Sequence, residues 1–186
     1  MNVVVKLQGG LGNQMFQYAF GKNISNITNR KLILDLSFLH RRDLGPDFVY
    51  RNFDLDIFNL KNVSVVNFYD GNYDLIVENF DPNSTIESIN TTIKEITQNK
   101  SDTIYLDGYW SSPHYFNKID FKFNKECLIE SNDLLLNIQN TNSVMLNIRR
   151  SDFLNNDFHG TYGKEYILKG IDNLKLKFTD LKFFIF

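Results

Sequence analysis

The beginning of the chain alternates between apolar runs and a helical stripe. Residues 2–7 and 31–36 are rich in β-branched and aliphatic side chains, a composition that favours strands. Between these runs, apolar residues recur at steps of four, four and three, the spacing of one helix face. They are Phe16, Phe20, Ile24 and Ile27. A strand, a helix and a strand in this order predict a parallel sheet with a right-handed crossover.

The middle of the chain predicts further strands and a second helix. Residues 63–67, 75–78 and 103–106 are short apolar runs typical of strands. Ser84 is followed three residues later by Glu87, the pattern of a capping box at a helix N-terminus. Helical spacing then continues through four apolar residues, Ile86, Ile89, Ile93 and Ile96. We therefore expect an α/β fold.

Residues 137–142 carry no periodic pattern and are the best linker candidate. We place a domain boundary there, which gives a first domain over residues 1–140 and the beginning of a second over residues 141–186. The second part contains an apolar run, a helical stripe and a final apolar run, over residues 144–148, 167–178 and 182–186. Two strands and one helix are too few to bury a core. We therefore expect the second domain to be truncated.

Composition and charge narrow the class of protein. The chain is 42% hydrophobic and 23% charged, as in globular proteins, and its net charge of −2 argues against a nucleic-acid-binding surface. Cys127 is the single cysteine, which excludes an internal disulfide and fits a reducing compartment. Residues 1–7 are too short for a signal-peptide core, and no apolar run approaches the roughly 18–20 residues of a membrane span. We expect a cytoplasmic protein with at most peripheral membrane contact.

Two adjacent arginines follow the apolar run at residues 144–148. Arg149 and Arg150 come at the expected carboxyl end of a strand, where open α/β sheets bind ligands. A guanidinium keeps its charge and matches phosphate oxygens with two parallel hydrogen bonds. The pattern favours a clamp for a nucleotide diphosphate. A solvated arginine pair bonded to Asp152 explains the same spacing equally well.

A glycine-rich segment separates the first strand from the first helix. Gly10 and Gly12 would let a ligand approach the backbone, and the helix N-terminus would offer free N–H groups to an anion. The segment is not the dinucleotide-binding fingerprint, because the third glycine would fall at Met15. A ribose-binding role for Asp35 depends on that same pattern. The alternative is a plain turn with Asn13 as the N-cap.

Three other groups of residues are weaker candidates. Residues 40–43 spell His-Arg-Arg-Asp but lie in a polar stretch, so we interpret them as a solvated loop. His114 and His159 lack the supporting ligands of a metal site, and we expect no metal. The aromatic rings of Tyr109, Trp110 and Tyr115 could stack on a sugar, although core packing is the favoured interpretation.

Residues 5–21, with the sequence VKLQGGLGNQMFQYAFG, closely resemble the opening of glycosyltransferase family 11, the α-1,2-fucosyltransferases. Residues 147–153 resemble the family's His-x-Arg-Arg-x-Asp motif except at the first position, which is Asn147. Further segments resemble the family in order along the whole chain, at residues 34–38, 50–58, 108–110, 159–161 and 183–186.

The resemblance implies an activity and a fold. Members of the family transfer L-fucose from GDP-fucose to the 2-hydroxyl of a galactoside, with inversion and without a metal ion or other cofactor. The partners of the chain would therefore be a nucleotide sugar and a galactoside glycan. The implied fold is GT-B, with two facing Rossmann-like domains and the donor held mainly by the second.

The resemblance also implies roles for individual residues. Arg149 and Arg150 would neutralise the diphosphate, most strongly as the leaving GDP gains charge. Asp152 would orient these arginines or serve the acceptor hydroxyl as the catalytic carboxylate. The first domain would contribute three residues near the donor sugar or phosphate, Gly10, Gly12 and Asn13.

Two departures from the family pattern bear on activity. Asn147 replaces the motif's histidine, and an amide cannot take up a proton. The family also continues past Phe186 with a Ser-Asp-Asp segment and a serine- and tryptophan-rich motif, both associated with the donor site. Two alternatives are therefore a related transferase that uses another nucleotide sugar, and an inactive fragment that only binds a sugar or a partner protein.

Overall fold

The computed structural model describes residues 1–45, 48–79, 81, 83–124, 126, 133–148 and 161–186. The chain divides into two compact units, residues 1–127 and residues 128–186. Each unit contains its own parallel sheet, and the two are described separately below.

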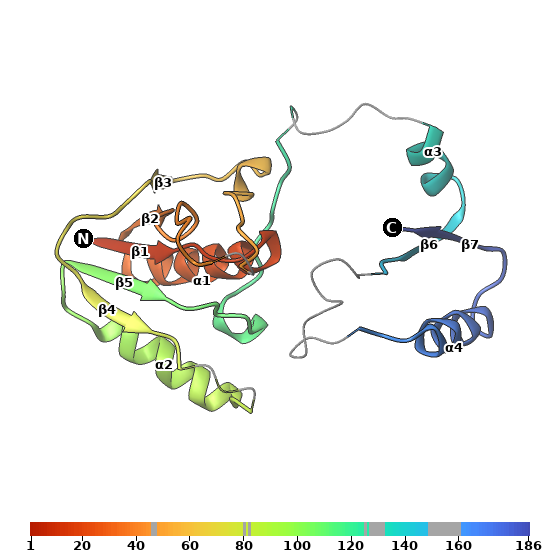
Figure 1. Ribbon diagram of the computed structural model, residues 1–186. Coiled ribbons are helices and arrows are strands. Elements are labelled where there is room, and N and C mark those ends of the chain that lie inside the picture. Colours follow the sequence, from red (N-terminus) through yellow and green to blue (C-terminus); the bar gives the residue numbers. More distant parts are fainter. Residues whose placement is uncertain (46–47, 80, 82, 125, 127–132, 149–160) are drawn as a thin grey trace. The chain divides into compact units, whose positions relative to one another are not determined.

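The first unit is built on a five-stranded parallel sheet (Figure 1). Its strands are β1 (Asn2–Lys6), β2 (Lys31–Asp35), β3 (Val63–Val66), β4 (Asp74–Val77) and β5 (Thr103–Asp107). They lie in the order β3-β2-β1-β5-β4, so the first strand is central. This Rossmann-like sheet confirms the predicted α/β class.

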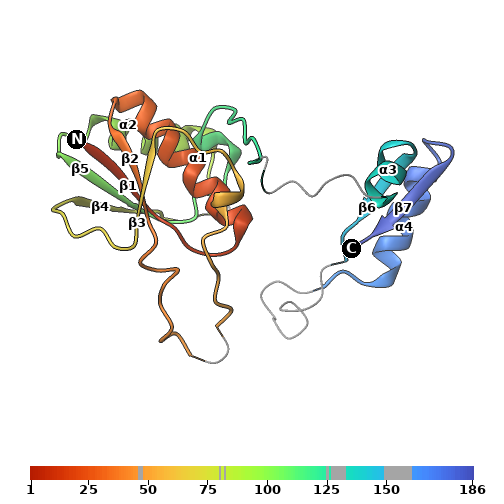
Figure 2. The same cartoon turned by 90° about the horizontal axis from the view of Figure 1, so that it is seen from above.

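Both long helices of the first unit, α1 (Leu11–Thr28) and α2 (Ile86–Gln98), lie on the same side of the sheet and contact each other (Figures 1 and 2). The steps from β1 to β2 and from β4 to β5 run in the same direction across the sheet, and right-handed crossovers therefore place both helices on one face. Two short 3₁₀ helices, η1 (Leu55–Ile57) and η2 (Pro113–Tyr115), pack beside α1.

The main core lies between this sheet face and the two helices. Side chains alternate between the faces of a strand, so Val3 and Val5 of β1 point to the same face, and both belong to the buried core cluster. The helices contribute buried residues from the predicted stripes, namely Phe20, Ile24, Ile89 and Ile96.

Each predicted helical stripe has one end that is exposed to solvent. Ile27 and Ile86 are each 55% exposed, because they lie on the last turn of α1 and the first turn of α2. The N-cap of α2 is Thr85, which accepts a hydrogen bond from the Ser88 N–H, so the capping box predicted at Ser84 is wrong by one residue.

A buried arginine fixes the amino edge of this sheet. α1 ends at Asn29 in the left-handed conformation, and the next residue, Arg30, is 8% exposed. Its guanidinium donates hydrogen bonds to the carbonyl oxygens of Asn99 at 2.8 Å and Ser101 at 2.6 Å. Arg30 therefore ties the end of α1 to the chain that leaves α2.

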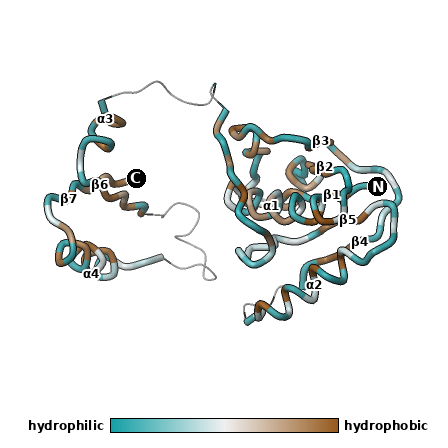
Figure 3. Tube along the Cα trace, turned by 180° about the vertical axis from the view of Figure 1, so that it is seen from behind, coloured by the Kyte–Doolittle hydropathy of each residue, from teal (hydrophilic) through white to brown (hydrophobic). Residues whose placement is uncertain are grey.

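The second unit contains α3 (Asp133–Gln139), β6 (Asn142–Leu146), α4 (Lys164–Lys175) and β7 (Leu181–Ile185). β6 and β7 form a parallel pair in which Val144 lies opposite Phe183. None of the residues described in this unit is classed as buried. Figure 3 shows hydrophobic and hydrophilic residues alternating around α4 and the hydrophobic colouring of β7.

The division of the chain differs from the expected one. Residues 137–142, predicted to be a linker, contain the end of α3 and the first residue of β6. The compact units meet between residues 127 and 128, earlier than the boundary expected near residue 140, because α3 contacts β6 and belongs to the second unit.

Candidate active site

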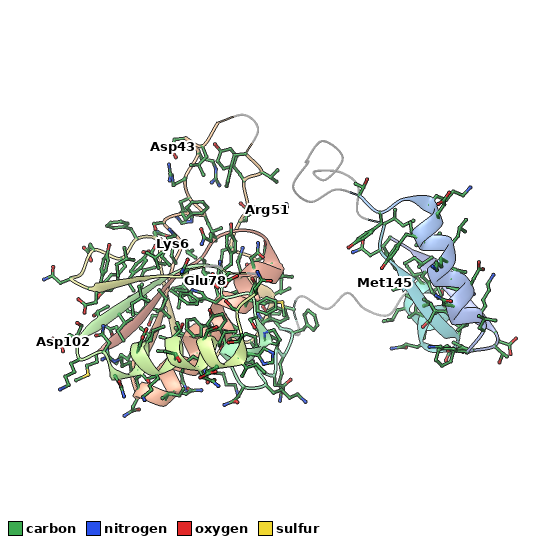
Figure 4. The ribbon with its side chains drawn as sticks, turned by 90° about the horizontal axis from the view of Figure 1, so that it is seen from below. Lys6, Asp43, Arg51, Glu78, Asp102 and Met145 are labelled. Carbon is green, nitrogen blue, oxygen red and sulfur yellow. The ribbon has the colours of Figure 1, made fainter. Side chains whose placement is uncertain are left out.

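Charged side chains gather at the carboxyl edge of the first unit's sheet. Lys6, Asp35 and Asp107 are the last residues of β1, β2 and β5, and Glu78 directly follows β4. Figure 4 labels Lys6 and Glu78 on this side of the unit and Asp102 at the opposite edge. Because open α/β sheets bind ligands at the carboxyl ends of their strands, this edge is where a site is expected.

The cation at this edge is already paired. Nζ of Lys6 lies 2.5 Å from Oδ2 of Asp107, and the two side chains are 21% and 26% exposed. The ion pair joins the neighbouring strands β1 and β5. Lys6 therefore serves the sheet edge and is not a free cation for a phosphate.

Asp35 is a structural carboxylate. It is 1% exposed; Oδ1 accepts a hydrogen bond from the Ser37 N–H at 2.7 Å, and Oδ2 accepts from the Tyr69 N–H at 3.1 Å and the Tyr105 hydroxyl at 3.0 Å. Burial raises the pKa of Tyr105, and the charge of Asp35 raises it further. Both carboxylate oxygens are thus engaged by the fold, which leaves no support for ribose binding by Asp35.

The turn between β1 and α1 holds the predicted residues Gly10, Gly12 and Asn13. Gly9 has a φ of +76°, and a Cβ at Gly9 would overlap Nδ2 of Asn13. The N-cap of α1 is Gly10, without a side-chain cap and with no acidic residue in the first turn, so the alternative of Asn13 as the N-cap is wrong. The first N–H groups of such a helix carry partial positive charge and suit an anion.

Two buried glutamines hold this turn, and sequence reasoning missed both. Gln17 is 0% exposed; its Oε1 accepts from the Gln8 N–H at 3.0 Å and its Nε2 donates to the Gln8 carbonyl at 3.1 Å. A side-chain amide thus pairs with the main chain as a neighbouring strand would. The only sequence signal for this role was the presence of amides beside an apolar helix stripe.

Gln14 connects the turn to a distant segment. This residue is also 0% exposed. Its Nε2 donates to the carbonyl oxygens of Gly9 at 2.9 Å and Asn52 at 2.8 Å, and its Oε1 accepts from the Asp54 N–H at 3.0 Å. Arg51, the residue before Asn52, has its Nε 3.8 Å from the position that a Cβ on Gly10 would take. Figure 4 labels Arg51.

Glu78 fixes the chain after β5. Its Oε2 accepts hydrogen bonds from the N–H groups of Tyr109 at 2.7 Å and Trp110 at 2.8 Å. Trp110 has a φ of +52° and is fully buried, with its ring stacked on Phe20 at 4.4 Å between centroids. Core packing of Trp110 and Tyr115 is therefore confirmed, and burial, followed by the charge of Glu78, raises the pKa of Tyr115.

Comparison with known proteins decides the family. The family model of glycosyl transferase family 11 matches residues 2–186. The chain belongs to glycosyl transferase family 11. An alpha-1,2-colitosyltransferase from Escherichia coli is 29% identical over an alignment 208 positions long, gaps included, which covers 99% of this chain and 68% of that relative. No solved structure matches the chain. The prediction of a glycosyltransferase is confirmed.

The family 11 arginine motif lies largely outside the described residues. Arg149, Arg150 and Asp152 belong to that part, and their donor-site roles stay predictions. The strand that precedes the motif is β6, which ends at Leu146, and Asn147 follows as an exposed residue. The motif therefore starts directly after a parallel strand, as predicted.

The look-alike tetrad at residues 40–43 is an exposed loop. Nε of Arg41 lies 2.9 Å from Oδ1 of Asp43, and these side chains are 45% and 69% exposed. The hydrogen bond from Arg41 lowers the pKa of Asp43. Arg42 lies over the Tyr50 ring, 5.3 Å from its centroid. The tetrad thus bonds within its own loop, which confirms the interpretation as a solvated stretch.

No group of three or more His, Cys, Asp or Glu side chains in the described part of the chain is placed to hold a metal ion. Within the same residues, none of the helices has the length and apolar character that crossing a membrane requires.

Proposed function

We propose that this family 11 enzyme transfers L-fucose from GDP-fucose to the 2-hydroxyl of a galactoside, with inversion and without a metal ion. The acceptor oxygen attacks the anomeric carbon from the face opposite the phosphate. The bond between that carbon and the phosphate oxygen breaks, its electron pair leaves with GDP, and the hydroxyl proton passes to a base. Family membership and the resemblance of residues 5–21 support this proposal.

The observation that carries an anionic donor is the start of α1. Gly10 ends the turn without a side-chain cap, the first helical turn has no acidic residue, and apart from the helix's own backbone and the neighbouring residues nothing lies within 4 Å of the position of a Cβ on Gly12. This leaves N–H donors and open space at the carboxyl edge of the sheet. Gly10, Gly12 and Asn13 would line the donor's path there.

The remaining roles follow the family motif. Arg149 and Arg150 would bind the diphosphate and stabilise the charge that develops on GDP as it leaves. Asp152 has two possible roles, orienting these arginines or accepting the proton of the acceptor hydroxyl. Asp152→Asn separates the two roles, because an amide oxygen still accepts hydrogen bonds from arginine but takes up no proton. Loss of turnover with unchanged GDP affinity would assign Asp152 as the base.

The acceptor side is supported by a cavity of about 380 Å³ beside Glu78. Its lining includes the hydroxyl-bearing residues Ser111, Ser112 and Tyr115, together with Ser84. Among the described residues that line it there is no lysine, arginine or histidine. Such a lining suits a neutral sugar better than a phosphate, because hydroxyl and carboxylate groups bond to sugar hydroxyls.

The test of the donor site is GDP binding by calorimetry. Arg149→Ala should weaken GDP binding about 10- to 100-fold, since a hydrogen bond to a charged group contributes about 1.5–3 kcal/mol. Arg41→Ala is the matched control, because it removes an exposed arginine from the look-alike tetrad. Equal affinities of the wild type and Arg149→Ala would contradict the proposal.

Asn147→His tests the departure from the family motif. If the family's histidine takes up a proton during transfer, the substitution should raise turnover and add an ionisation near pH 6.5 to its pH profile. Unchanged turnover would assign the position an orienting role instead.

A second candidate is colitosyl transfer, favoured by the name of the Escherichia coli relative. Colitose lacks the 3-hydroxyl of L-fucose, so the two donors differ in one hydrogen-bonding group. A pocket built to bond that hydroxyl rejects the deoxy sugar by a large factor, about 10⁴. Comparing kcat/KM for GDP-fucose and GDP-colitose on one galactoside acceptor decides between the two donors.

A further inference from the structure

We propose that a second cavity, between β4 and α2, binds the sugar attached to the acceptor galactose, and that the indole N–H of Trp110 donates a hydrogen bond to that sugar. The inference rests on the proposed function and extends its acceptor side. The acceptor would then be a glycan of at least two sugars, and the first unit would recognise both of them.

The second cavity continues the first one along α2. Its volume is about 380 Å³, within the range of about 300–1,000 Å³ that is typical of ligand sites. The two cavities share Glu78, Asn79 and Tyr115, so they are neighbours. Ile89 lines the first cavity, and Ile96, roughly two helical turns later, lines the second. A ligand longer than one sugar can therefore occupy both.

Trp110 carries a hydrogen-bond donor that the fold does not use. The residue is fully buried, and its ring stacks on Phe20. In the described part of the chain, its Nε1 is the one buried side-chain nitrogen or oxygen without a hydrogen-bond partner. Such a group destabilises a folded protein unless it finds an acceptor. Because Trp110 also lines the second cavity, a ligand there can supply that acceptor.

The nitrogen end of the indole lies beside Glu78. Cε2 of Trp110, the atom bonded to Nε1, is 3.0 Å from the position that a Cβ on Gly108 would take, and Oε2 of Glu78 is 2.9 Å from the same position. Nε1 is covered by its neighbours, so a ligand oxygen reaches it when a lining side chain turns aside, a common change on binding. The N–H group is therefore close to a residue that both cavities share.

The groups around the second cavity favour a ligand with hydroxyl groups. An indole N–H only donates and a carboxylate only accepts, so a ligand that bonds to Trp110 and to Glu78 or Glu95 must do both. A sugar hydroxyl does both. Ile76 and Ile96 add apolar surface for the C–H groups of a sugar ring. The described lining residues include no lysine, arginine or histidine, so a phosphate would find no positive charge there.

Comparing a monosaccharide with disaccharides tests the second cavity. The probes are methyl β-galactoside, lactose and the β-1,3-linked isomer of lactose, titrated into the full chain with GDP present and followed by NMR. At least one disaccharide should bind about 2- to 10-fold more tightly than methyl β-galactoside, because each additional neutral hydrogen bond contributes about that factor. Equal affinities for all three probes would overturn the proposal.

The indole signal of Trp110 reports on the proposed hydrogen bond directly. Trp110 is the only tryptophan in the chain, so its indole N–H gives a single signal in NMR spectra of isotope-labelled protein. This signal should move as the tighter disaccharide binds and move less with methyl β-galactoside. A signal that stays fixed while the disaccharide saturates the protein would overturn the role of Trp110 and would point to a water molecule as its partner.

Glu95→Ala and Glu87→Ala form a matched pair on α2. Both glutamates are exposed, but Glu95 lines the second cavity and Glu87 lines neither cavity. Glu95→Ala should weaken disaccharide binding about 2- to 10-fold, and Glu87→Ala should leave it within about twofold of the wild type. Equal effects of the two substitutions would overturn the proposal.

Trp110→Phe removes the N–H group and keeps an aromatic ring beside Phe20. It should reduce the preference for the disaccharide over methyl β-galactoside, and an unchanged preference in the folded variant would overturn the role of the indole. If this core variant unfolds, the glutamate pair and the indole signal of the wild type decide the question.

The outcomes also separate this inference from the proposed function. A chain that binds methyl β-galactoside and both disaccharides equally well overturns the second subsite and leaves the proposed acceptor side intact. A chain that binds none of these sugars overturns both.

Discussion

Buried polar side chains in the first unit bond mainly to the main chain. Gln14 and Gln17 bond to carbonyl and N–H groups around the glycine turn, and Asp35 accepts from two N–H groups and one phenol. Buried polar groups that lack partners destabilise a fold, so these pairings are what allow the residues to be buried. Sequence patterns could not predict them, because the bonding partners of Gln14 in residues 52–54 belong to a separate segment.

Gly9→Ala and Gly12→Ala should have opposite effects on stability. Gly9 has a φ of +76° and no room for a Cβ beside Asn13, so alanine there should cost about 1–3 kcal/mol. Gly12 lies in the first turn of α1 with open space around it, so alanine there should be neutral or stabilise by up to about 1 kcal/mol. Urea unfolding of both variants checks the pair, and a stable Gly9→Ala would contradict the strain argument.

Tyr105 should make the protein sensitive to alkaline pH. Burial and the charge of Asp35 raise the pKa of Tyr105, whereas the phenol of an unfolded chain ionises near pH 10. Above about pH 10 the unfolded chain loses this proton and the folded chain keeps it, so stability falls as pH rises, by up to about 1.4 kcal/mol per pH unit. Compared with the wild type, Tyr105→Phe should be less stable at pH 8 and should lose stability less steeply above pH 10. If the urea midpoints of the wild type and of Tyr105→Phe fall by the same amount between pH 8 and pH 11, the role of Tyr105 is refuted.

The elements themselves were largely predictable from local pattern. The apolar runs correctly predicted the five strands described in the first unit and the two described in the second, because short runs of β-branched and aliphatic residues favour strands. Their order was not predictable, since nothing in residues 103–107 marks β5 as the neighbour of β1. The exposure of Ile27 and Ile86 was missed for a similar reason: periodicity identifies a helix face, and only tertiary structure shows how far the sheet beneath it extends.

Gly21 should tolerate no side chain, although alanine is a better helix former. A Cβ at Gly21 would overlap Cγ2 of Val5 and lie 3.1 Å from Cδ1 of Leu32, so α1 would have to move away from the sheet. We expect Gly21→Ala to cost about 1–3 kcal/mol, as other overpacked cores do. Gly170→Ala, in α4 with nothing within 4 Å, is the control and should not destabilise. Thermal unfolding compares the two, and equal shifts would refute the close approach of α1 and β1.

The two units differ in how they are held together. The first has a contiguous core between one sheet face and two helices. The described part of the second has a two-stranded sheet, exposed apolar side chains such as Met145 at 67% and Ile185 at 66%, and no buried residue. Since the stability of a region follows its buried apolar contacts, the second unit should open more readily.

Hydrogen exchange, measured separately for each strand, should show this difference in stability between the two units. Amides of β1 and β5 are expected to exchange at least about tenfold more slowly than those of β6 and β7, because the former lie beneath a buried core. Native-state exchange followed by mass spectrometry of peptides from each strand makes the measurement. Equal protection of β6 and β1 would show that the second unit has a stabilising partner.

Arg30 has a consequence for how this protein tolerates change over evolutionary time. Its guanidinium is received by peptide carbonyls of Asn99 and Ser101, which every amino acid carries. These two bonds therefore do not depend on which side chains stand at positions 99 and 101, whereas a lysine in place of Arg30 would lose one of the two carbonyl partners. The side chains of Asn99 and Ser101 bond to Asp74 instead, so in orthologues we expect the arginine at position 30 to persist even where that second set of bonds has changed.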